Sequence, residues 1–237
     1  MRKLAVFSWL LLPIFAGAYH YGPGQDQLKL DEVARVLRVA DQAAASEHWD
    51  TAVALYDEAL VALPADRIKE VRRIRLERAK AEMLNQQLPE ANADLKGLIE
   101  ELQADKSTDP KFLAEARESL GTSQYYMTWL MKLEGLGRAD WEPEIESSRQ
   151  AYRLLAEEAD KAGDTASSQK YSEDLESAIR LARMEPGELQ GKAIPKQCKN
   201  CKSGQCKKPG RNPNKSQNKP KDSRGASQGP EPDGSGS

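Results

Sequence analysis

The stretch that decides the fold is His48-Trp49-Asp50-Thr51-Ala52-Val53-Ala54-Leu55-Tyr56-Asp57-Glu58-Ala59-Leu60-Val61-Ala62-Leu63-Pro64. Its apolar residues recur at intervals of three and four, which places them on one face of a helix. Pro64 ends this helix, because proline lacks a backbone N–H and clashes with the preceding turn. The small residues Ala52 and Ala59 flank Tyr56, so a second helix can approach closely on this face. The stretch therefore predicts one half of a helical hairpin.

The spacing of Ala52, Tyr56, Ala59 and Pro64 resembles the second helix of a tetratricopeptide repeat (TPR), which commonly reads A-x3-F/Y-x2-A-x4-P. The resemblance implies stacked helical hairpins in a short right-handed solenoid and a role as a protein-binding scaffold. An ordinary helical bundle is the alternative.

A second copy of the pattern follows, although it is looser. The first three positions recur 39 residues further along, whereas a TPR normally has 34 residues; they are Ala91, Leu95 and Leu98. The resemblance covers roughly residues 30–185, is strongest at 48–64, weaker at 88–98 and degenerate elsewhere.

The rest of the chain also favours an all-α fold, because no segment shows the strict alternation of a strand. We expect a first helix opening at Asp31-Glu32, and Pro89 suits the first turn of its helix. Further helices are expected from Pro110 to Leu133, from Trp141 onward, and from about Tyr171 until Pro186-Gly187. The domain prediction is a signal peptide at 1–18, an irregular leader at 19–27, a TPR-like helical domain at 28–186 and a disordered tail at 187–237.

The amino terminus has the pattern of a secretory signal peptide. Arg2 and Lys3 precede a short apolar run, and Ala16-Gly17-Ala18 offers a small-residue cleavage site. The run over residues 4–18 is shorter than the roughly 20 apolar residues that span a bilayer. We therefore expect export to the periplasm, the cell envelope or the extracellular space; a retained segment would instead anchor the chain to a membrane.

The net charge of −2 hides an asymmetry. Residues from 187 onward carry eleven basic and four acidic side chains, a net charge of +7, whereas residues 4–186 carry 22 basic and 33 acidic side chains, a net charge of −11. The tail is rich in Gly, Pro, Ser, Asn, Gln and Lys, a composition typical of disorder. It has no aromatic residue on which bases could stack, so nucleic acid is not favoured as a partner.

All three cysteines lie in this tail, at Cys198, Cys201 and Cys206. Their C-x2-C-x4-C spacing matches the opening of a zinc knuckle, but Arg211 occupies the fourth ligand position and cannot coordinate a metal. They are weak metal candidates, and we expect no cofactor. In an exported chain, a Cys198–Cys201 or a Cys201–Cys206 disulfide with one spare thiol is favoured over metal.

In a TPR stack, the first helices of the pairs line a groove that takes a partner segment. The resemblance implies that the lining residues here are Leu37, Asp41 and Ala44 from the first pair, and Arg73, Leu76, Lys80 and Met83 from the second. Leu37 and Asp41 stand where some TPR domains have a Lys/Asn clamp for a carboxyl-terminal tail, which argues against that kind of partner. The basic helix at 66–84 offers charge-assisted hydrogen bonds to acidic groups; the favoured alternative is a solvated face on which Glu70, Glu77 and Glu82 pair with its cations.

Catalytic patterns are missing from the sequence: it has no phosphate-binding glycine loop and no HExxH, and its only histidines are His20 and His48. We expect a non-enzymatic scaffold or adaptor with a protein partner and no small-molecule substrate. The alternative is a thiol-, metal- or anionic-surface-binding protein that acts through its basic tail.

Overall fold

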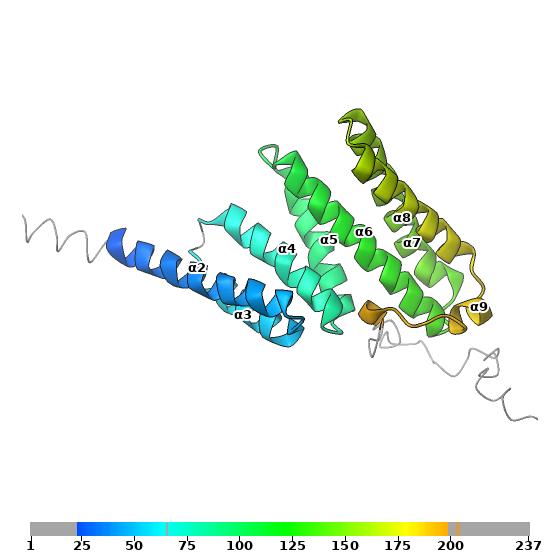
Figure 1. Cartoon of the computed structure of the whole chain (residues 1–237), viewed down its shortest axis with the longest axis horizontal. Helices are drawn as coiled ribbons and strands as arrows, with labels where there is room; N and C mark the ends of the chain where they lie inside the picture. The colour runs from blue at the N-terminus through cyan, green and yellow to red at the C-terminus, as the bar shows by residue number, and fades with distance from the viewer. Residues whose placement is uncertain (1–22, 65, 199–202, 204–237) are drawn as a thin grey trace, which may run out of the picture. The chain divides into compact units, whose positions relative to one another are not determined.

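The computed structural model describes residues 23–64, 66–198 and 203, and all regular secondary structure in these ranges is helical (Figure 1). The all-α prediction is therefore confirmed for the described part of the chain. Two compact units are present, Met1–Glu82 and Met83–Ser237. Each unit is described by itself.

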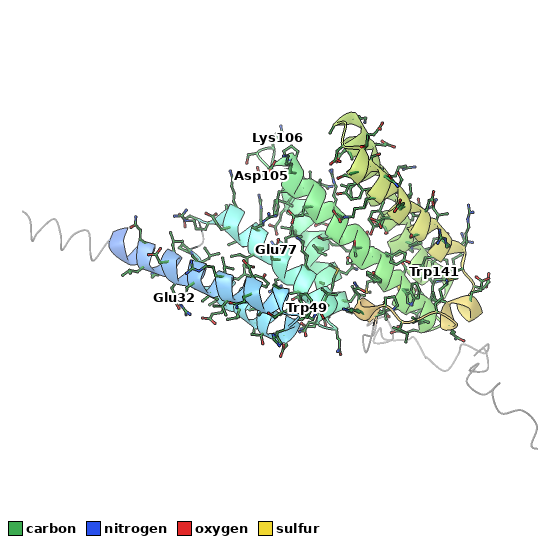
Figure 2. All side chains as sticks on the ribbon, viewed as in Figure 1. Glu32, Trp49, Glu77, Asp105, Lys106 and Trp141 are labelled. Carbon is green, nitrogen blue, oxygen red and sulfur yellow. The ribbon has the colours of Figure 1, made fainter. Side chains whose placement is uncertain are left out.

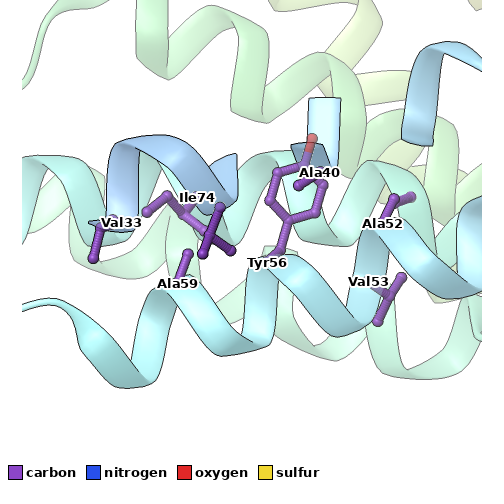
Figure 3. Packing of buried hydrophobic residues seen from close by; sticks show 9 residues of the cluster. Val33, Ala40, Ala52, Val53, Tyr56, Ala59 and Ile74 are labelled. Carbon is purple, nitrogen blue, oxygen red and sulfur yellow. The ribbon is translucent and has the colours of Figure 1, made fainter. Parts of the chain in front are cut away.

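The first unit is built from α2 (Pro23–Ala45), α3 (Trp49–Ala62) and most of α4 (Ile68–Leu84). Helices α2 and α3 pack against each other. The Tyr56 ring extends from α3 toward Ala40 of α2, between the small Ala52 and Ala59 (Figure 3). Tyr56 is only 3% exposed, and burying a large side chain of this kind contributes about 1.5–3 kcal/mol. The face predicted from the sequence at 48–64 is thus the core of this unit.

The second unit contains α5 (Leu88–Ala104), α6 (Pro110–Leu133), α7 (Arg138–Lys161), α8 (Thr165–Arg183), α9 (Pro186–Gln190) and the short 3-10 helix η1 (Lys196–Cys198). Local signals set several of the boundaries. Asp109 caps α6 by accepting a hydrogen bond from the Lys111 N–H at 3.2 Å, and Asp164 caps α8 through the Ser167 N–H at 3.1 Å. Consecutive helices from α5 to α8 pack in chain order (Figure 1).

The contact between α6 and α7 repeats the pattern seen in α3. Ser148, Tyr152 and Leu155 have the small-x3-aromatic-x2 spacing, and all three are buried. The Ser148 hydroxyl donates to the Gly121 carbonyl oxygen at 2.8 Å. A Cβ added at Gly121 would lie 3.4 Å from the Ala151 Cβ, so the two helices are already in close contact there. The sequence analysis expected a helix from Trp141 onward but did not recognise that it repeats this pattern.

Three helix ends share one turn geometry. Glu47, Gly135 and Gly163 all have positive φ, at 58°, 73° and 75°. After each, the next residue donates its N–H to the carbonyl five residues back, as in His48 to Ala43 at 2.9 Å. This is the Schellman arrangement, in which glycine is preferred because other residues crowd their own Cβ.

We therefore expect Glu47→Gly to raise the free energy of unfolding by up to about 1 kcal/mol. Gly163→Ala is the matched reverse change, because a Cβ there meets no atom within 4 Å and the cost of about 1 kcal/mol is conformational. Urea unfolding followed by circular dichroism measures both. A loss of stability in Glu47→Gly would contradict the conformational argument.

Two helices begin earlier than the sequence analysis expected. Helix α2 begins at Pro23, so residues 23–27 of the expected leader are helical. Proline suits a first helical position because its φ is already helical and the N–H there needs no partner. Helix α7 begins at Arg138, before the expected start at Trp141, and contains Pro143 inside it.

Helical structure also continues beyond residue 186, where the sequence analysis ended the helical domain. The described part of the tail continues as α9 and η1, both of which contact α6. Leu189, Cys198 and Ser203 are buried. The polar composition of this region predicted disorder, but burial of a few particular side chains depends on α6, which is distant in sequence.

The amino-terminal prediction falls outside the described residues, because the description begins at residue 23. None of the helices in the described ranges is long and apolar enough to cross a membrane.

Candidate functional site

The polar residues predicted for the groove lie in the first unit, and each has an intramolecular partner. Asp41 accepts the Tyr56 hydroxyl at 2.7 Å. Glu77 of α4, labelled in Figure 2, receives Lys80 Nζ at 3.1 Å and lies 4.0 Å from Arg73 Nε. A partner's carboxylate would therefore compete with Glu77 for the same two cations.

The apolar residues predicted for the groove are mostly enclosed. Leu76 is fully buried and Met83 nearly so, while Leu37 is partly buried against the core of the first unit. Ala44 packs at the edge of the same core. Leu76 and Met83 are thus unavailable to a partner in this conformation, because α4 buries residues on more than one side. A single periodic stripe in the sequence could not reveal the second buried side.

The basic helix α4 carries ion pairs, but only part of them lie on a solvated face. Arg67, just before the helix, pairs with the exposed Glu70 at 3.5 Å, whereas Arg78 lies 3.3 Å from Glu82, which is buried. Arg78 also bonds Asp57 of α3 at 2.6 Å. These pairs offset much of the positive charge that the sequence shows in this helix. An exposed pair contributes at most about 1 kcal/mol to stability, so a partner could displace it at small cost.

In the second unit, a buried lysine joins three helices. Lys132 of α6 is 4% exposed, and its ammonium donates to the carbonyls of Leu181 and Ala182 at 2.8 and 3.2 Å. These carbonyls lie in the last turn of α8, where a helix has unpaired acceptors and a partial negative charge. The same ammonium lies 4.2 Å from the ring centroid of Trp141 on α7, labelled in Figure 2. Burial lowers the pKa of Lys132, and Glu185 partly opposes this shift.

A polar and aromatic surface joins α6 to α8. Glu118 of α6 accepts Lys170 Nζ at 2.5 Å and the Tyr171 hydroxyl at 2.9 Å, both from α8. The pKa of Tyr171 is raised to about 12, mainly by burial and secondly by the hydrogen bond to Glu118. The pKa of Asp174 is also raised, first by burial and then by Glu118 and Glu173, although Lys170 opposes this shift. The surface carries charges of both signs and favours no single ligand charge.

An open depression lies at the end of α8, beside α9. Its lining contains two arginines, two glutamates and two apolar side chains: Glu176, Ile179, Arg180, Arg183, Met184 and Glu188. The charges balance, so the depression selects neither anions nor cations.

The described chain beyond α8 is fastened to α6 at Cys198 and Ser203. The Cys198 thiol donates to the Tyr126 carbonyl oxygen at 3.6 Å. Glu134 accepts the Ser203 N–H at 2.8 Å and also the Ser203 hydroxyl. Cys201 and Cys206 lie outside the described residues, and no group of potential metal ligands gathers in the described ranges. The sequence analysis singled out Cys198 for its chemistry but missed Tyr126 and Glu134, which no local signal connects to the tail.

The described residues thus define an all-α protein in which α2 packs against α3, and consecutive helices from α5 to α8 pack against each other. Comparison of the chain with protein-family models gave no match, and comparison with curated proteins gave none either.

Proposed function

We propose that this chain is a non-enzymatic, TPR-like scaffold that binds a segment of a protein partner. The observation that carries the proposal is the alternation of the helices. The second helix of each expected pair, α3, α5 and α7, buries residues at the same spacing: Ala52-Tyr56-Ala59, Ala91-Leu95-Leu98 and Ser148-Tyr152-Leu155. In a stack of hairpins, helices α2, α4, α6 and α8 would line the groove, and α8 would be the terminal helix that a solenoid requires.

The partner surface that we propose is the exposed side of α4, centred on Arg73 and Lys80. Both cations form ion pairs with Glu77, and all three side chains are partly exposed. An acidic segment of a partner could replace Glu77 through charge-assisted hydrogen bonds. The signal-like residues 1–18 support placement of this scaffold in the cell envelope or secretory space.

Charge reversal tests this surface. We expect the full-length double variant Arg73→Glu/Lys80→Glu to recover at least about tenfold less partner than wild type in affinity capture from its own source, because like charges at an interface cost several kcal/mol. Quantitative mass spectrometry of the captured proteins measures the difference. Undiminished capture by this variant would rule out the α4 surface.

Two controls accompany the experiment. Arg138→Glu/Arg149→Glu reverses one exposed and one partly exposed arginine of α7, both also paired with glutamates on their own helix, and it should leave capture unchanged. Deleting residues 204–237 removes most of the basic tail while keeping α9, η1 and Ser203. A partner that is retained by this deletion fits the scaffold, whereas a partner that is lost indicates the alternative, binding through the tail.

A further inference from the structure

The described chain beyond α8 lies on α6 as a strap, which we define as residues 186–198 and 203. Its helices α9 and η1 both contact α6 (Figure 1). Leu189 of α9 is 1% exposed and Cys198 of η1 is 3% exposed, whereas Ile194 between them is 55% exposed. The strap is therefore buried at a few separate points. Elements with so few buried apolar side chains open at the low end of a protein's range of local stabilities.

The surface of α6 beneath the strap offers hydrogen-bond acceptors and aromatic rings. Glu134 accepts both the N–H of Ser203, at 2.8 Å, and its hydroxyl, and the Tyr126 carbonyl accepts the Cys198 thiol at 3.6 Å. Burial is the largest cause of the raised pKa of Tyr125 and Tyr126, and Cys198 adds to both shifts, so the strap lies beside both rings. The strap thus contacts α6 in the way that a bound peptide would, through single side chains and a pair of donors.

We propose that the α6 surface under the strap is a second binding surface for a protein segment, and that the strap occupies it until such a segment displaces the strap. The strap shows the chemistry of the segment that fits: an aliphatic anchor in place of Leu189, and an N–H and hydroxyl pair in place of Ser203. Glu134 repels an acidic residue at that point, so this surface and the cationic one on α4 select different segments. The proposal rests on the proposed scaffold function for the nature of the partner.

The strap acts as an intramolecular competitor. A tethered segment has an effective concentration of about 1 mM at its site. If the strap is docked for about nine-tenths of the time, a detached peptide of the same sequence should bind the open surface with a dissociation constant of about 0.1 mM. The same peptide should bind wild type about tenfold more weakly, because only the undocked fraction is competent.

Release of the strap in the full-length chain tests the competition. We expect a fluorescent peptide of residues 186–203 to bind Leu189→Asp about tenfold more tightly than wild type in reducing buffer, as measured by fluorescence anisotropy, because a charge cannot remain at the buried anchor. Ile194→Asp adds the same charge at an exposed position of the strap and should match wild type. Equal affinities for Leu189→Asp and wild type, or no binding to Leu189→Asp, would overturn the proposal.

Hydrogen exchange on the same variant checks that the strap alone has opened. Residues 186–198 should lose protection in Leu189→Asp while α5 to α7 keep theirs, which also shows that the second unit stays folded. Unchanged protection of 186–198 would mean that Leu189 does not anchor the strap, and the proposal would be wrong.

A second substitution locates the surface on α6. Adding Glu134→Lys to Leu189→Asp should weaken peptide binding at least about tenfold, because it replaces the acceptor of the donor pair with a cation. Adding Glu146→Lys, the same change at an exposed position of α7, is the control and should leave the affinity unchanged. Undiminished affinity after Glu134→Lys would place the peptide elsewhere and refute the surface. These measurements use neither α4 nor an external partner, so their failure is distinct from a failure of the Arg73→Glu/Lys80→Glu experiment.

Discussion

Replacing Tyr152 with alanine is expected to lower the free energy of unfolding of the second unit by about 3–5 kcal/mol. Tyr152 is 4% exposed and packs beside Gly121, where α6 and α7 are in close contact. Glycine and serine permit that closeness, so neither offers a side chain long enough to fill the cavity left by the ring. Thermal and urea unfolding measure the loss.

Two further variants separate the effect of the Tyr152 ring from that of its hydroxyl and from that of any apolar truncation in the same helix. Tyr152→Phe removes only the hydrogen bond with the Thr122 hydroxyl at 3.0 Å and should cost about 1 kcal/mol. Leu154→Ala changes an exposed apolar residue of the same helix. Its free energy of unfolding should differ from that of wild type by at most about 0.5–1 kcal/mol. If Tyr152→Ala were as mild as Leu154→Ala, the hairpin packing described for α6 and α7 would be wrong.

Replacing Lys132 with alanine should destabilise the second unit by about 2–3 kcal/mol, since it removes the ammonium donor from the last carbonyls of α8 and the cation from Trp141. Lys132→Met keeps an aliphatic chain of similar length, so the difference between the two variants measures the packing of the stem. Lys161→Ala, at an exposed position in α7, is the control and should be nearly neutral.

The lowered pKa of Lys132 adds a pH signature to the same experiment. The folded chain releases this proton at a lower pH than the unfolded chain does. Between those two pKa values the unfolded state binds more protons, so the contribution of Lys132 to the free energy of unfolding rises with pH. Lys132→Met lacks this term, and its stability relative to wild type should fall as alkaline pH is approached. A constant difference across that range would contradict the burial of the ammonium.

The helical core was predictable because its signals are local. The periodic face at 48–64 predicted the burial of Tyr56, and the 39-residue offset predicted that of Leu95; both are buried. Asp109-Pro110 and Asp164 marked helix starts through side chains that act within one turn. The candidate site was less predictable. Periodicity identifies one buried stripe, but α4 buries residues on more than one side, so Leu76 and Met83 could not be told from groove residues.

The sequence by itself determined that the described chain is helical, where most of its helices run, and that Tyr56 is buried, because capping, proline geometry and apolar spacing act over one or two turns. Only the tertiary structure decided that Lys132 caps α8, that Glu134 holds Ser203, and that Cys198 is buried on α6. Those contacts join residues 49 or more positions apart. Burial and hydrogen bonding at such separations depend on how helices pack, whereas composition alone predicted a disordered tail for the region that contains Cys198 and Ser203.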